Sequence, residues 1–422
     1  MKKTIFTTLL TISFVSVLFL TGCGQKTTQP DTDTVPNTVQ NTEQSESKGD
    51  TSIQEKFWQA VAKGSLDDVK TLIEQGADTK TPYKNDGWTP LPPPSKIIIP
   101  ENHWTPLYFA AAHNSNVDVL KYLVEKGANV NIKTDSGETP LHVAASTNSN
   151  VDVLKYLIEK GADVNAKDMM GWTPLHFAAA HNSNVDILKY LVEKGADINA
   201  KNKYNDETPL TWAVRRGNSN VDVLKYLVEK GADVNTKDIA GWTLLHFAAS
   251  NNSNVDVLKY LVEKGADVNA KSNEGKTPLF IAAISGNLGF IKYFVAQGLI
   301  ANVKDNYGKT PLFNAASSGN LELVKYFVAQ GLDVNEKSND GETPLFNAVR
   351  SSKSKYGLVW TGHESPLPNL NNLNIVKYLV NAVGADVNVK NNSAETPLDV
   401  VPDDAEEVKK FLREKGCKSW KD

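Results

Sequence analysis

A Thr-Pro-Leu motif recurs along this chain at nearly constant intervals. Nine copies, one of which has leucine in place of proline, begin at Thr105, Thr139, Thr173, Thr208, Thr243, Thr277, Thr310, Thr343 and Thr396. Successive copies lie 33 to 35 residues apart, except that the last interval is 53 residues. A constant period of this length is typical of a solenoid, in which short units stack on one another instead of surrounding one common core. The period therefore predicts the architecture of the chain and leaves its function open.

The segment 173–201 shows why each unit should contain two helices. Thr173 suits a helix N-cap, and Pro174 takes the first helical position, where a missing N–H costs nothing. Polar turn residues around Asn184 separate this helix from a second one, whose apolar side chains recur at helical spacing. Gly195 is the expected left-handed terminator, after which a short hairpin returns the chain to the next Thr-Pro.

The combination of T-P-L-H-x-A, a second helix and G-A-D-V-N resembles the ankyrin repeat, over roughly residues 53–416. This resemblance implies a mainly α fold, in which each unit is a β-hairpin followed by an α-hairpin and the units stack into a curved array. It also implies that His142, His176 and His246 hydrogen-bond near the hairpins and link neighbouring units. Ankyrin proteins generally bind protein partners through the hairpin tips and the concave face made by the first helices.

The ends of the array and two internal segments depart from the pattern. A helix pair over 57–78 has no Thr-Pro start, and the last helix has a charged outer face, so both suit terminal caps. Insertions near 91–103 and 351–372 are punctuated by proline and glycine and are predicted to be loops. Residues 417–422 form a short tail.

The N-terminus has the composition of a targeting segment followed by a linker. In residues 1–22, two lysines precede an apolar run that is too short to span a membrane. The run ends in Leu-Thr-Gly-Cys, which is similar to the bacterial lipoprotein signal box and implies that Cys23 becomes the lipid-modified N-terminus. An ordinary secretory signal with an incidental cysteine is the alternative. Residues 23–52 are polar and predicted to be a disordered tether.

Composition and motifs argue against several other functions. The net charge of −4 gives no electrostatic case for nucleic-acid binding. With only Cys23 and Cys417 present, no internal disulfide is expected. Two Gly-Lys-Thr triplets lack the earlier glycine that a phosphate-binding loop needs, and the histidines lie one unit apart, too widely spaced for a metal. We therefore expect no cofactor and no catalysis.

Positions that differ between otherwise similar units indicate where a partner could bind. One such position precedes the repeat threonine and is occupied by Trp104, Glu138, Trp172, Glu207, Trp242, Lys276, Lys309, Glu342 and Glu395. Another is the end of the first helix, with His113, Thr147, His181, Arg215 beside Arg216, Asn251 and Arg350. Tryptophan and arginine are enriched at protein interfaces. The hairpin tips add the apolar residues Met169, Met170, Tyr204 and Ile239.

These features coincide in the middle repeats, residues 139–271. The predicted protein-binding residues are Met169, Met170, Trp172, His181, Tyr204, Arg215, Arg216 and Trp242. Two alternatives stay open: each tryptophan could fold back onto the neighbouring hairpin, and the helix-end cations could simply be solvated. Trp212 is in register with Phe177 and Phe247 and is predicted to belong to the core.

Taken together, the sequence predicts a monomeric scaffold that is lipid-anchored in the bacterial envelope and binds a protein partner. Gly24 follows the cysteine, where an aspartate commonly retains lipoproteins in the inner membrane, so an outer membrane is favoured if the cell has one. Two further hypotheses are a purely structural envelope protein without a specific ligand and an enzyme with its site in the 351–372 insertion.

Overall fold

The computed structural model describes residues 52–79, 104–251, 254–299, 302–351 and 372–420. The chain divides into two units, and the unit 51–422 contains all of these residues. The predicted signal peptide, Cys23 and the tether up to residue 51 lie outside these ranges. So do the whole predicted insertion near 91–103 and residues 352–371 of the second one.

The described residues form nineteen α-helices and no strand, which confirms the mainly α class. In chain order the helices are α1 (Ile53–Lys63), α2 (Leu66–Glu74), α3 (Pro106–His113), α4 (Val117–Glu125), α5 (Pro140–Thr147), α6 (Val151–Glu159), α7 (Pro174–His181), α8 (Val185–Glu193), α9 (Pro209–Arg215), α10 (Val221–Glu229), α11 (Leu244–Asn251), α12 (Val255–Glu263), α13 (Pro278–Ile284), α14 (Leu288–Ala296), α15 (Pro311–Ser317), α16 (Leu321–Ala329), α17 (Pro344–Arg350), α18 (Asn372–Asn381) and α19 (Glu406–Glu414). We call α1 and the odd-numbered helices to α17 the first helices, and the even-numbered helices the second helices.

Local sequence signals set the ends of these helices as predicted. The helix α7 begins at Pro174 behind an N-cap threonine, and the same Thr-Pro start opens α3, α5, α9, α13, α15 and α17. The side chain of Asn184 caps α8 by accepting a hydrogen bond from the backbone N–H of Asp186 at 3.0 Å. After α8, Gly195 adopts a φ of 92°, which ends the helix in the left-handed region that glycine tolerates.

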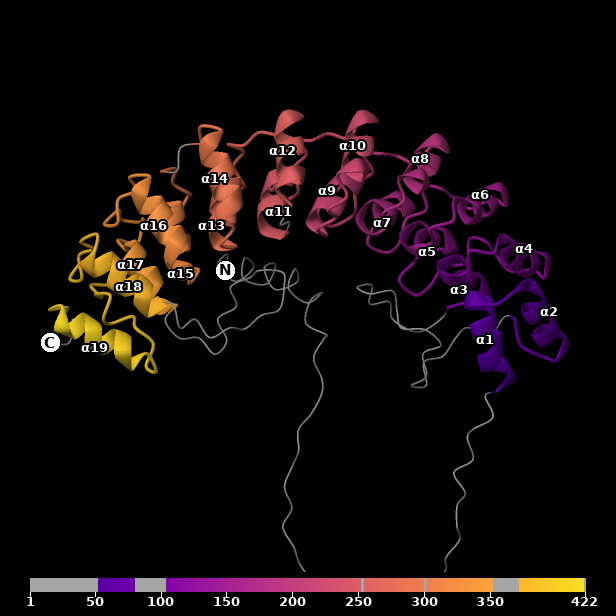
Figure 1. Cartoon of the computed structure of the whole chain (residues 1–422), viewed down its shortest axis with the longest axis horizontal. Helices are drawn as coiled ribbons and strands as arrows, with labels where there is room; N and C mark the ends of the chain where they lie inside the picture. Colours follow the sequence, from indigo (N-terminus) through magenta and orange to yellow (C-terminus); the bar gives the residue numbers. More distant parts are fainter. Residues whose placement is uncertain (1–51, 80–103, 252–253, 300–301, 352–371, 421–422) are drawn as a thin grey trace, which may run out of the picture. The chain divides into compact units, whose positions relative to one another are not determined.

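The helices pack in two rows, because each unit buries its apolar face mainly against its neighbours. The first helix α7 contacts α5 and α9, the second helix α8 contacts α6 and α10, and α7 and α8 contact each other. Figure 1 shows this order of helices along residues 51–422. Leu175, Leu188 and Leu191 are fully buried members of the core, and equivalent side chains continue it through every unit. The core is a series of local contacts, as the period predicts.

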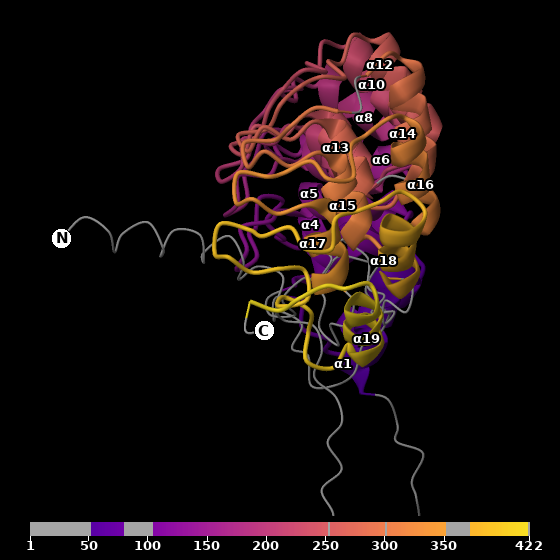
Figure 2. The same ribbon diagram turned by 90° about the vertical axis from the view of Figure 1, so that its left-hand side faces the viewer.

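The described loops between successive repeats project to the same side of the helices, with the second helices on the opposite side (Figure 2). The loops contain isolated backbone pairs, such as the N–H of Asp168 and the carbonyl oxygen of Trp172 at 3.1 Å, but no strand is assigned among the described residues. Gly171 closes one loop with a φ of 82°, and a Cβ there would lie 2.7 Å from the backbone nitrogen of Lys203 in the next loop. Neighbouring tips are therefore in close contact.

The two ends of the array are formed by α1 with α2 and by α19. The helix α1 starts with a capping box between Ser52 and Glu55. The helix α19 buries Phe411 and Leu412 on one face and carries charged residues on the other. Just beyond it, Cys417 is a free and buried thiol whose Sγ lies 2.7 Å from the carbonyl oxygen of Val387.

Candidate protein-binding surface

Buried histidines hold the bases of three loops in place. The N–H of Thr173 donates to Nδ1 of His176 at 3.1 Å, so the ring proton is on Nε2, which donates to the carbonyl oxygen of Glu207 in the next unit at 3.2 Å. His142 and His246 repeat this arrangement. Burial lowers the pKa of His176 to about 3 and those of the other two to about 4. The predicted structural role of these histidines, linking neighbouring units, is confirmed.

Four large apolar side chains are exposed on consecutive loop tips. Met169 is 63% exposed, Met170 40%, Tyr204 50% and Ile239 61%. Hydrogen bonds join the tips that carry them: the N–H of Lys203 donates to the carbonyl oxygen of Met170 at 2.9 Å, and that of Ile239 donates to Asn205 at 3.2 Å. We call Met169, Met170, Tyr204 and Ile239 the apolar tip strip. Because backbone hydrogen bonds join the neighbouring tips, the four exposed apolar side chains are held on adjacent loops.

The two tryptophans predicted to anchor a partner from the loops lie at the bases of those loops instead. Trp172 is only 8% exposed and stacks on Trp212 with a centroid separation of 4.1 Å. Trp242 is half-buried and packs against His246 and Phe247, the latter at 5.3 Å between ring centroids. The sequence left open whether Trp172 contacts a partner or packs against a neighbouring unit, and the structure shows the packing. Trp242 keeps a partly exposed ring.

Trp212, which the register predicts to be core, is half-buried and outside the core cluster. The equivalent residue of α7, Phe177, is also half-buried, whereas the equivalent residue of α11, Phe247, is 5% exposed and belongs to the core cluster. The guanidinium of Arg216 lies 4.1 Å from the ring centroid of Trp212, the same separation as in the stacking contact of Trp212 with Trp172. The Arg216 guanidinium and the Trp172 ring are both too close to share one face of Trp212, so the Trp212 ring lies between them.

Arg215 and Arg216 have different surroundings. Arg215 forms an ion pair with Glu207, whose side chain is fully buried. Burial raises the pKa of Glu207, and the charge of Arg215 opposes that rise. The pairing recurs eight residues apart between Glu342 and Arg350. A buried carboxylate without its cation would be strongly destabilising, so Arg215 stabilises the unit.

Arg216 and His181 lie at the exposed ends of their first helices. Arg216 is exposed and forms no ion pair with any described residue, while His181 is half-exposed at the end of α7. The structure therefore brings Trp172, Trp212, Arg215 and Arg216 together. Met169, Met170 and Tyr204 lie apart from them, on the tips. Sequence reasoning placed Trp212 in the core and so missed that its ring is partly exposed.

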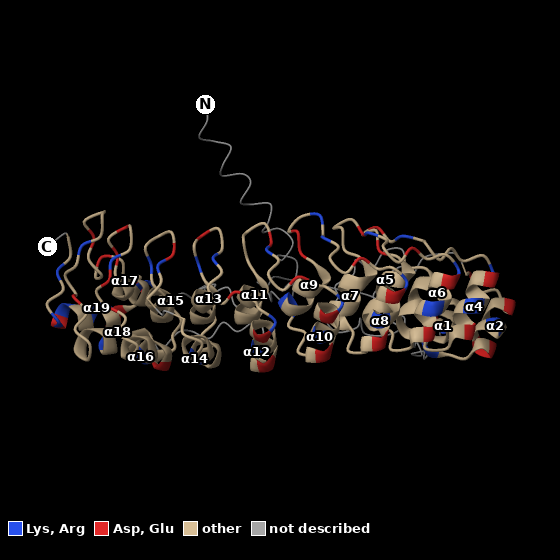
Figure 3. Ribbon diagram, turned by 90° about the horizontal axis from the view of Figure 1, so that it is seen from above, with Lys and Arg blue, Asp and Glu red and all other residues tan. Residues whose placement is uncertain are grey.

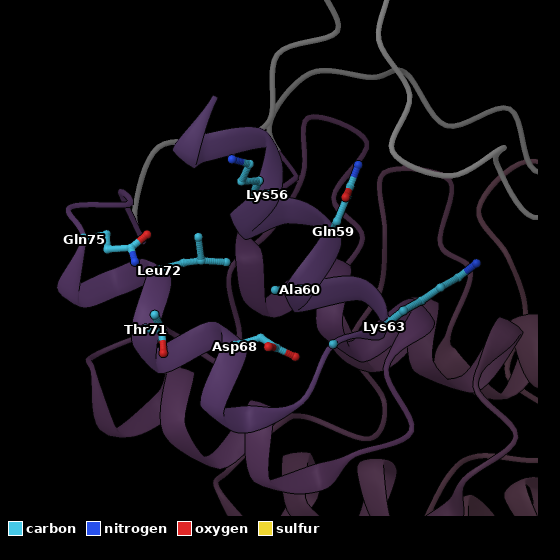
Figure 4. Close-up of a pocket in the computed structure, with 9 residues that line it drawn as sticks. Lys56, Gln59, Ala60, Lys63, Asp68, Thr71, Leu72 and Gln75 are labelled. Atoms are coloured by element: carbon cyan, nitrogen blue, oxygen red, sulfur yellow. The ribbon is translucent and has the colours of Figure 1, made fainter. Parts of the chain in front are cut away.

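The remaining features of the described residues are a hollow on the terminal cap and charged residues along the loops and second helices. A hollow of about 510 Å³ between α1 and α2 is lined by Lys56, Gln59, Ala60, Lys63, Gly64, Asp68, Thr71, Leu72 and Gln75 (Figure 4). This is a polar depression on the terminal cap. Charged residues of both signs follow the loops and second helices (Figure 3), often as exposed pairs such as Asp186 and Lys189 at 2.9 Å. Within the described ranges there is no cluster of metal-ligand residues and no helix that is long and apolar enough to cross a membrane.

The fold and surface define a class of protein: a helical repeat solenoid with exposed loop tips. Comparison with family models identifies the family. A model of three ankyrin repeats matches residues 93–168, 167–238, 237–305 and 287–359. A model of many ankyrin repeats matches 57–123, and one of a single ankyrin repeat matches 340–392. A search of the curated proteins found no match. The chain belongs to the ankyrin-repeat family, and these repeats imply a scaffold for protein–protein interaction.

Proposed function

We propose that this protein is a lipid-anchored ankyrin scaffold of the bacterial envelope that binds a protein partner through its middle repeats and acts without catalysis. The observation that carries the binding part is the apolar tip strip, in which residues 40% to 63% exposed occupy three linked tips. Solvent disfavours such a surface, whereas burial against a partner would stabilise it. Ankyrin proteins are in general non-catalytic scaffolds, which supports the absence of an enzymatic role.

The proposed anchor is Cys23, and its support is the Leu-Thr-Gly-Cys box behind a basic and apolar leader. Lipid on this residue would hold the array at a membrane surface through the polar segment 24–52, whose reach as a flexible coil is roughly 30 Å. An outer-membrane position, if the cell has such a membrane, and a monomeric state complete the proposal.

The binding proposal is tested by replacing all four residues of the apolar tip strip with serine in the full chain. Their side chains are exposed, so helicity and thermal stability should stay close to those of the unchanged protein. Recovery of cross-linked partner from the native envelope should fall by about tenfold or more if these residues are buried anchors.

The matched control is Tyr307→Ser, which removes a side chain that is also 50% exposed on a tip outside the strip. This variant should recover the partner as well as the unchanged protein does. Equal recovery by the four-residue variant, with helicity intact, would show that the tip strip is not the binding surface.

A further inference from the structure

The unit that contains the hairpin 202–207 and the helix α9 departs from its neighbours in several respects. In six other loops a glycine adopts a φ between 74° and 84° at the close of the turn, but here Asp206 does so with a φ of 57°. In the last loop Ala394 takes this place, with a φ of 64°. The same unit has tryptophan at position 212, where α7 and α11 have phenylalanine, and two arginines at the end of the helix. A non-glycine residue in the left-handed region carries a conformational cost. Departures that cost stability tend to occur at functional sites.

The charges around this unit are unequally satisfied. Glu207 is paired with Arg215, and Asp206 with Lys201 at 3.4 Å. The Oδ1 atom of Asp238 accepts the backbone N–H groups of Ala240 and Trp242 at 2.9 and 2.7 Å. Each nearby carboxylate therefore already has a partner at one oxygen, and Oε2 of Glu207 is buried without a hydrogen-bond partner among the described residues.

Arg216 is left with an aromatic contact and no carboxylate among the described residues. Desolvation of the guanidinium by its neighbours, followed by the charge of Arg215, lowers the pKa of Arg216, and the charge of Glu207 opposes this shift. The guanidinium of Arg216 lies against Trp212, which in turn stacks on Trp172. Stacking limits the rotamers of the arginine, so less side-chain freedom is lost when it binds.

We propose that Arg216, backed by Trp212, binds a carboxylate of the partner protein, from an acidic residue that lies beside an apolar one. The planar guanidinium offers two parallel N–H donors that match a carboxylate, and the partly exposed ring of Trp212 offers apolar surface next to it. This inference rests on the proposed function, and it names the chemistry of the partner at one point. Arg215 acts as a positioning residue for the Trp212 ring. Its ion pair with Glu207 holds the Arg215 guanidinium beside that ring, 5.8 Å from the centroid.

The test uses the full chain in detergent and two sets of immobilised ten-residue peptides. The first set is randomised over Glu, Leu, Phe and Gly, and the second has Gln wherever the first has Glu. The unchanged protein should bind the best Glu peptides about tenfold or more tightly than their Gln counterparts, the range expected for a hydrogen bond to a charged group. Arg216→Gln should abolish this preference, and Arg216→Lys should retain part of it.

Lys337→Gln is the matched control, because it removes one exposed positive charge from a distant hairpin and should leave the preference unchanged. Equal binding of Glu and Gln peptides, or a preference that survives in Arg216→Gln, would overturn the inference. Loss of helicity in Arg216→Gln would be checked against Arg216→Lys, which keeps a positive charge at this position.

The two proposals can fail separately. If the serine variant of the apolar tip strip loses the native partner while Arg216→Gln retains it, the scaffold function stands and the carboxylate site does not. If neither variant affects recovery of the partner, both the site and the binding surface are wrong.

Discussion

Single buried residues make this array sensitive to acid. His142, His176 and His246 each accept a backbone hydrogen bond at Nδ1, which a second proton would abolish. Their pKa values in the folded protein, about 4, about 3 and about 4, lie below the ordinary value of 6.5. The unfolded chain therefore binds protons first as the pH falls. The stability that these histidines contribute is complete above about pH 6.5 and is lost as the pH falls towards 4.

We expect that replacing all three histidines with threonine flattens this dependence. Threonine already occupies the equivalent position at Thr211, where its Oγ1 lies 3.0 Å from that of Thr208. The variant should be less stable than the unchanged protein at pH 7, and the difference in unfolding free energy should shrink by pH 4.5. The lowered pKa of each histidine corresponds to roughly 3 kcal/mol of unfolding free energy, lost between about pH 6.5 and about pH 4.

Denaturant titrations followed by circular dichroism at the two pH values measure this difference. Buried carboxylates such as Glu138 and Glu207 have raised pKa values, caused first by burial, and so add stability as the pH falls. They are present in both proteins, so their effect cancels in the comparison. An equal difference at pH 7 and pH 4.5 would show that the histidines do not titrate on unfolding.

At the scale of helices and loops, each element depends on its immediate neighbours. The helix α8 contacts α6, α10 and α7, and Leu191 is fully buried in that contact. Asparagine side chains add links between loops, as when Nδ2 of Asn165 donates to the carbonyl oxygen of Gly195 in the next unit at 2.8 Å. Such arrays lose structure locally, because no contact connects distant units.

Leu191→Ala should lower stability by about 2–5 kcal/mol through the lost apolar contact and the cavity left behind. Hydrogen exchange should speed up most in α6, α8 and α10 and least in α16 and α18. Val192→Ala, at a half-buried position in the same helix, is the control and should have a smaller effect. Uniform loss of protection from α1 to α19 would instead indicate one cooperative core.

At the scale of the whole molecule, the proposed anchor lies in a different unit from the array. Residues 1–50 form one unit and 51–422 the other. The lipoprotein proposal depends on residues 1–50 alone, while the binding surface lies in residues 51–422. The anchor and the binding surface can therefore be tested by separate substitutions.

Cys23→Ala should prevent both incorporation of radiolabelled palmitate and cleavage of the leader, because the thiol that carries the lipid is gone. Cys417→Ala is the matched control, since Cys417 is the only other cysteine and is buried beside Val387. Lipid labelling followed by mass measurement of the N-terminus checks both variants. Unchanged labelling of Cys23→Ala would exclude this anchor.

Sequence alone determined the features that depend on interactions within one unit. The start of α7 at Pro174, the end of α8 before Gly195 and the caps at both termini follow from hydrogen bonds between residues two to four apart. The histidine contacts were implied by the ankyrin resemblance, because every copy of the repeat brings the same groups together. Exposure of the tips was also predictable, since loops between buried helices face solvent.

Only the tertiary structure decided which side chains of different units meet. Trp172 and Trp212 are forty residues apart in sequence, and their stacking depends on the separation and twist of neighbouring first helices. That contact buries Trp172, which is 8% exposed, and covers one face of Trp212, which stays half-buried. Likewise, identical arginines acquired different roles, because the buried Glu207 pairs with Arg215 and leaves Arg216 against a ring. A repeating pattern records what every unit shares, whereas the candidate site is made from what differs between adjacent units.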